Sequence, residues 1–197
     1  MFKHSIVLIL SFMLFTSAMA GEAFMVDTKS SQAEWVGRKV TGQHNGAINI
    51  KSGMLHLEDG KLVGGEFEID MTTIVNHDVE DEEWRTKLVN HLKSDDFFSV
   101  DKFPVAVFKI THVESTTDED GNNYLIRGGL TIKGITHPIE FPAKVEINGD
   151  KISATAAITV DRAKHDIRFR SGSFFENLGD KLIYDEFTIN VDLVVFK

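Results

Sequence analysis

Four runs of alternating apolar and polar residues follow one another in the second half of the chain, with only short turns between them. A period of two is typical of a β-strand with one buried face and one exposed face. Short turns rich in Gly, Asn and Asp connect antiparallel neighbours, because parallel strands need a long crossover. We therefore predict an antiparallel meander with strands at 105–115, 123–132, 139–147 and 151–161.

Three strands are predicted before this meander and one after it. The third of them shows the pattern most clearly, because Phe67, Ile69 and Met71 alternate with acidic residues. In the second, Ser52 and Gly53 interrupt the alternation and predict a bulge. The predicted ranges are 33–40, 45–57, about 62–74, and 187–196.

Segment 78–93 changes from strand to helical periodicity, since Trp84, Leu88 and Leu92 recur four residues apart. Acidic residues gather in its first turn and basic residues near its end, which matches a helix dipole. We predict one amphipathic helix between the third and fourth strands. Trp84 and the pair Phe97–Phe98 are expected to pack as a satellite core; the alternative is a lid over one end of the fold.

Eight antiparallel strands admit either a closed barrel or a two-sheet sandwich, and periodicity does not distinguish them. Composition favours the barrel, because Ala154 and Ala156 follow each other on the inward face of one strand, where a solid core needs bulk. A closed eight-stranded barrel has room for one small ligand. The predicted fold class is therefore all-β, a single extended antiparallel β-barrel of about eight strands with one helix.

Residues 1–20 are predicted to be a secretory signal peptide: Lys3 precedes an apolar stretch at 6–15, and Ala18-Met19-Ala20 has the small-x-small cleavage pattern. The apolar stretch is shorter than the ~20 residues a bilayer span needs. We expect residues 21–197 to form one domain that does not span the membrane and is secreted, with a bacterial periplasm as the favoured location.

Composition argues against two kinds of function, thiol chemistry and nucleic-acid binding. The chain has no Cys, so thiol chemistry is excluded. The signal segment carries one of the 21 basic residues and none of the 30 acidic ones, so the mature charge is −10 and nucleic acid is not an expected partner.

Two separated motifs, SDDFFSVDKFPVAVFKI at 94–110 and GGLTIKGITHPIEFPAKV at 128–145, resemble the signature of the YceI-like family of secreted lipid-binding or polyisoprenoid-binding proteins. The resemblance runs from SSQAEW at 30–35 through HNGAINIKSG and GGEFEIDMTTI to the last strand. It implies a lipocalin-like barrel whose tunnel holds an isoprenoid, a quinone tail or a fatty-acid derivative. It implies no catalytic residues and no cofactor, and relatives suggest a homodimer.

The predicted ligand-binding wall consists of apolar side chains that alternate onto the inward faces of the strands. The alternation of inward and outward positions along the strands, taken alone, favours a dry, filled core for these residues. The family resemblance instead favours an open lumen. The predicted wall residues are Trp35, Phe67, Ile69, Phe108, Ile110, Leu130, Phe141, Ala154, Ala156, Ile158, Phe187 and Ile189.

One basic cluster lies in the irregular stretch after the meander: Arg162, Lys164, Arg168 and Arg170. Its ordinary role is pairing with neighbouring acidic residues. The sharper hypothesis is that Arg168 or Arg170 contacts a polar or anionic lipid headgroup at the barrel mouth.

No metal site is predicted, because the seven histidines after residue 20 show no ligand spacing. We predict a secreted lipid-binding protein that is not an enzyme. The alternatives are an envelope or stress-related interaction protein that uses the barrel as a scaffold, and, less favoured, a lipid-modifying enzyme that uses Asp161, His165 and Asp166.

Overall fold

The structure is a computed structural model that describes residues 21–197. Its strands form one antiparallel sheet in the order β1-β4-β5-β6-β7-β8-β9-β10-β2-β3, and β1 also pairs with β10. The predicted signal peptide lies outside the described residues. The strands are β1 Glu22–Val26, β2 Gln32–Lys39, β3 Gly42–Ala47, β4 Asn49–Glu58, β5 Lys61–Asp70, β6 Val105–Ser115, β7 Tyr124–Ile132, β8 Ile135–Asn148, β9 Lys151–Asp161 and β10 Ile183–Phe196.

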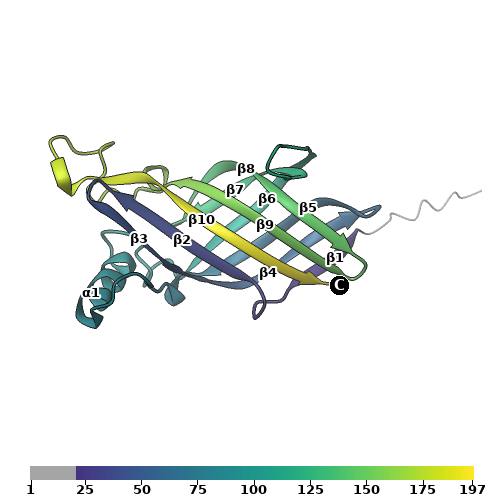
Figure 1. Cartoon of the computed structure of the whole chain (residues 1–197), viewed down its shortest axis with the longest axis horizontal. Coiled ribbons are helices and arrows are strands. Elements are labelled where there is room, and N and C mark those ends of the chain that lie inside the picture. Colours follow the sequence, from purple (N-terminus) through teal and green to yellow (C-terminus); the bar gives the residue numbers. More distant parts are fainter. Residues whose placement is uncertain (1–20) are drawn as a thin grey trace, which may run out of the picture.

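The sheet closes because β10 has two partners along one edge. Residues 195–196 pair with β1, and residues 183–192 pair with β2. Strands β1 and β2 therefore lie end to end along the same edge of β10 and count as one strand of the barrel. Strands β3 and β4 also count as one, because only Ile48 separates them. Counted this way, the fold is a closed eight-stranded antiparallel barrel (Figure 1), which confirms the predicted fold class.

Several strand bounds differ from the prediction. The third predicted strand ends at Asp70 rather than near residue 74, because Met71–Thr73 form a 3-10 turn, η1, capped by the Asp70 side chain. Strand β1 was not predicted, because five residues are too few for an alternation to stand out. Strand β8 begins four residues earlier than predicted, at Ile135, despite Pro138 and Pro142. These prolines are tolerated because residues 135–142 pair with β7 alone, so this part of β8 lies at a sheet edge on its other side. Strand β10 also starts four residues earlier, at Ile183.

Helix α1, Glu82–Lys93, is the one α-helix among the described residues, and it lies between β5 and β6 as predicted. It begins four residues later than predicted, where the side chain of Asp81 accepts a hydrogen bond from the backbone N–H of Trp84. The residues before it, 74–78, form a strap along the free edge of β3. Two backbone hydrogen bonds hold the strap, from Val75 to Ala47 and from His77 to Asn45.

The two ends of the barrel differ (Figure 1). At the end of β1 and the C-terminus, the side chains of Phe24, Leu57, Ile152 and Val195 are at most 1% exposed and fill the interior. The other end carries α1, the strap, the β2–β3 hairpin and a crossing segment, residues 162–182, which contains the 3-10 turns η2 (Arg162–His165) and η3 (Gly179–Lys181).

Candidate ligand-binding site

A cavity of about 300 Å³ lies inside the barrel, and its wall is apolar almost throughout. All eight strands of the barrel, counted as above, contribute inward side chains, and helix α1 contributes Leu88 and Leu92. Ligand sites in proteins have volumes of about 300–1,000 Å³, so this space is large enough to hold an apolar ligand.

Each of the twelve apolar residues predicted to form the wall, from Trp35 to Ile189, borders this cavity. Ala154, Ala156 and Ile158 remain partly accessible although they face inward. A filled core would bury these side chains completely, so the barrel is hollow beside them.

The hollow arises where small side chains meet across neighbouring strands. Ala143 of β8 lies directly opposite Ala156 of β9, and both are on the cavity wall. Directly opposed inward positions have Cβ atoms about 5 Å apart, so two methyl groups leave space that larger pairs would occupy. The adjacent Ala154 extends this space along β9.

The cavity reaches solvent at the end that carries α1. Its wall there includes Arg38, Lys39 and His44 of the β2–β3 hairpin and Tyr184 of β10. Tyr184 is 49% exposed and Arg38 is also exposed, so these residues mark an entrance. The opposite end is closed by the packed side chains around Phe24.

Residues near the entrance come partly from the predicted satellite core. Phe97 is buried, Phe98 is half-buried, and both line the cavity. Trp84 was expected on the buried face of α1, but it is 65% exposed. Its ring instead lies under the ammonium of Lys87, 4.5 Å from the centroid, because Trp84 is in the first turn, beyond the part of α1 that contacts the barrel.

Neither Arg168 nor Arg170 is on the cavity wall. Arg168 pairs with Asp166 and lies 4.9 Å from the Phe174 ring, and Arg170 lies over Phe169 at 5.0 Å. Both belong to the exposed side of the crossing segment. The arginine of this cluster that borders the cavity is Arg162, which is 2% exposed.

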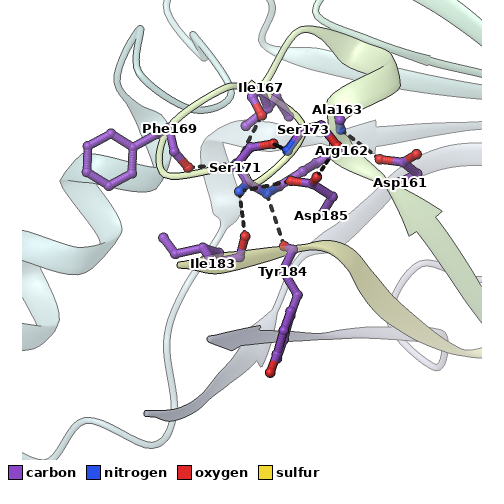
Figure 2. A network of polar contacts seen from close by, with 10 residues as sticks. All are labelled: Asp161, Arg162, Ala163, Ile167, Phe169, Ser171, Ser173, Ile183, Tyr184 and Asp185. Atoms are coloured by element: carbon purple, nitrogen blue, oxygen red, sulfur yellow. Dashed lines mark hydrogen bonds and ion pairs between the residues drawn. The ribbon is translucent and has the colours of Figure 1, made fainter. Parts of the chain in front are cut away.

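Arg162 holds the crossing segment against the start of β10 (Figure 2). Its guanidinium donates hydrogen bonds to four carbonyl oxygens, and Nη2 lies 3.2 Å from Oδ1 of Asp185, an ion pair without hydrogen-bond geometry. Burial lowers the pKa of Arg162, and the charges of Asp185 and Asp161 oppose that shift. With its donors engaged in this way, Arg162 is a structural residue. The four carbonyls belong to Ile167, Phe169, Ile183 and Tyr184.

The structure does not bring Asp161, His165 and Asp166 together as a catalytic group. Asp161 accepts a hydrogen bond from the backbone of Ala163, and Asp166 pairs with Arg168. His165 is 1% exposed, and its Nδ1 lies 3.0 Å from the carbonyl oxygen of Ile135. Among residues 21–197, no three potential metal ligands converge, and no helix has the length and apolar character to cross a membrane.

The burial of His165 predicts a pH dependence of stability. Burial lowers the pKa of His165 below 6.5, against the opposing effect of the Ile135 hydrogen bond. Between that lowered pKa and 6.5, the unfolded chain binds a proton that the folded chain does not, so stability falls as the pH drops below about 6.5. Urea unfolding between pH 7.5 and 5 is expected to show this slope reduced in His165→Gln. The exposed-site variant His112→Gln should keep it; an unchanged slope in His165→Gln would contradict the assignment.

Curated relatives match part of the chain. The UPF0312 protein ECA1782 of Pectobacterium atrosepticum is 42% identical over 60 residues, which are 30% of this chain and 29% of that protein. A UPF0312 protein of Shewanella denitrificans is 28% identical over 137 residues, 66% of each chain. The first match thus spans less than a third of the relative's length.

Solved structures share the fold over most of the chain. Burkholderia cenocepacia BcnA superposes with a TM-score of 0.65 at 21% identity, covering 86% of this chain and 98% of that one. A polyisoprenoid-binding domain from Saccharophagus degradans, implicated in plant cell wall breakdown, gives a TM-score of 0.61 at 13% identity, covering 88% and 97%.

Both neighbours therefore share the overall fold over more than four fifths of this chain. The family match rests on the sequence itself. Residues 24–195 fit the sequence model of the YceI-like domain, and the chain therefore belongs to the YceI-like family.

Proposed function

We propose that this protein binds a long apolar chain, such as a polyisoprenoid, a quinone tail or a fatty-acid derivative, inside the barrel. The observation that carries the proposal is the hollow, apolar cavity of about 300 Å³ with one end at solvent. Each CH₂ group moved from water into such a wall contributes about 0.8 kcal/mol, so a long chain binds without polar contacts.

The structural neighbour from Saccharophagus degradans, described as a polyisoprenoid-binding domain, supports this ligand class through the shared fold. We extend the proposal to a non-catalytic carrier that is secreted, with a periplasmic location, and that forms a homodimer. Sedimentation of the purified mature protein tests the dimer, and fractionation of the source cells tests the location.

Filling the cavity tests the proposed function. Ala156→Phe places a benzyl group in the hollow and is expected to abolish binding of a long-chain ligand with little change in stability, because the new ring enters empty space. The measurement is native mass spectrometry of protein purified without detergent, followed by extraction and identification of the released lipid.

The matched control is the next residue on the same strand. Ala157 is exposed and lies on the outer face of β9, so Ala157→Phe should retain the ligand. Stoichiometric lipid in wild type and Ala157→Phe, with none in Ala156→Phe, is the expected pattern. If wild type has its bare mature mass and takes up neither polyprenols nor fatty-acid derivatives, the barrel is a scaffold and the proposal fails.

A further inference from the structure

The cavity wall carries charge of one sign. Its charged residues are Arg38, Lys39 and Arg162, accompanied by His44 and His91, and no Asp or Glu of the described residues lines it. The whole chain has the opposite balance, with 30 acidic and 21 basic residues. A basic lining in an acidic protein focuses positive potential on the cavity and attracts an anion to it.

Of these cations, Lys39 is both unpaired and inward. The charge of Arg162 is paired with Asp185. Arg38 borders the cavity at its entrance, but it is exposed and alternates onto the opposite face of β2 from Trp35. Lys39 lies on the inward face with Trp35, opposite Gly42 of β3 and Ile183 of β10, and its ammonium has no ion-pair partner within residues 21–197.

His44 is the diagonal neighbour of Lys39 on the same inward face, because it lies opposite Gly37 in the β2–β3 register. Its Nδ1 is 2.8 Å from Oδ2 of Asp78, which orients the ring and leaves Nε2 for another partner. Burial alone would raise the pKa of Asp78, but hydrogen bonds from the Asn45 backbone, His44 and Asn76 lower it overall. Asp78 is thus a carboxylate engaged by its own neighbours, outside the cavity wall.

Open space adjoins this pair. Gly37 is on the cavity wall, and a Cβ atom placed there would meet no other atom within 4 Å. A head group can therefore lie beside Gly37 while its chain extends past Trp35 into the barrel.

We propose that Lys39 and His44 form a head-group site, and that the ligand is an amphiphile with an anionic head, a phosphate or a carboxylate, on a long apolar chain. This inference rests on the proposed function, since it assigns the polar end of the molecule whose tail fills the cavity. The Lys39 ammonium and the His44 ring bind the head at the entrance, and the wall binds the tail.

Two ligands of equal chain length, a polyprenyl monophosphate and the corresponding polyprenol, test the inference on delipidated protein. Wild type is expected to bind the phosphate roughly 10-fold more tightly, the effect of one hydrogen-bonded charge pair. Lys39→Met should bring the two affinities close together without weakening the polyprenol. Lys151→Met removes an exposed lysine near the closed end and should keep the wild-type preference.

Equal affinities of wild type for both ligands, or an unchanged preference in Lys39→Met, would overturn the head-group site while the lipid-binding function stands. Failure of both ligands to bind would instead remove the proposed function. Inorganic phosphate alone, titrated into the same protein, separates a lipid head from a free anion. We expect inorganic phosphate to bind far more weakly than the polyprenyl ester. If it binds as tightly, the ligand is a free anion and the proposal of an amphiphilic ligand fails.

Discussion

Replacing Arg162 with Met is expected to lower the free energy of unfolding by about 3–5 kcal/mol, because one partner of a buried ion pair is removed. The change leaves Asp185 without its cation and four carbonyl oxygens without their donor. Those carbonyls belong to the crossing segment and the start of β10, so the loss should also loosen the entrance. Urea unfolding followed by tryptophan fluorescence measures the stability, and hydrogen exchange of residues 162–185 measures the loosening.

The matched control is Arg168→Met, six residues along the same segment. Arg168 pairs with Asp166 at the surface, and exposed pairs of this kind contribute about 0–1 kcal/mol. We expect Arg168→Met to unfold close to wild type. A similar small change in Arg162→Met would show that the buried network does not hold the crossing segment.

Replacing Gly46 with Ala is expected to destabilise the protein by about 2–4 kcal/mol, from overpacking and a broken hydrogen bond together. A Cβ atom at Gly46 would lie 1.9 Å from the carbonyl oxygen of Val75, so the strap must move. That same oxygen accepts a hydrogen bond from the indole Nε1–H of Trp35 at 3.0 Å. Because the strap leads directly into α1, displacement should also weaken ligand binding.

Gly37 provides the comparison for Gly46 in the same hairpin. A Cβ atom at position 37 would meet no other atom within 4 Å, and the backbone there does not need a positive φ. The Gly37→Ala variant should therefore be about as stable as wild type. Differential scanning calorimetry of the two variants side by side makes the test. Equal melting temperatures would mean that the strap shifts without loss and that its contact with β3 contributes little.

Much of the fold was predictable because its signals are local. Alternation and short turns predicted the β6 to β9 meander, and the interruption at Ser52 and Gly53 predicted the register shift that the structure has between residues 50 and 52. Since successive side chains in a strand point to opposite faces, the same pattern predicted which residues, such as Trp35 and Phe187, face inward. Trp84 shows the limit, because helical spacing does not say where the helix passes beyond the barrel.

Only the tertiary structure separated residues that look alike in the sequence. Arg162, Arg168 and Arg170 have the same chemistry and lie within nine residues, yet one is buried on the cavity wall and two are outside it. The sequence around Lys39 and His44 contains no recognisable binding motif. They become neighbours through the register of β2 with β3, and their inward position at the entrance depends on how the hairpin joins the barrel.

The sequence by itself therefore determined most of the strands, their antiparallel order and the inward set of apolar side chains, because each follows from periodicity over a few residues. The tertiary structure decided the closure through β10, the hollow at Ala143 and Ala156, and the basic entrance. The closure pairs Met25 with Phe196, near opposite ends of the chain, and the hollow and the entrance depend on strand register, which no local pattern specifies.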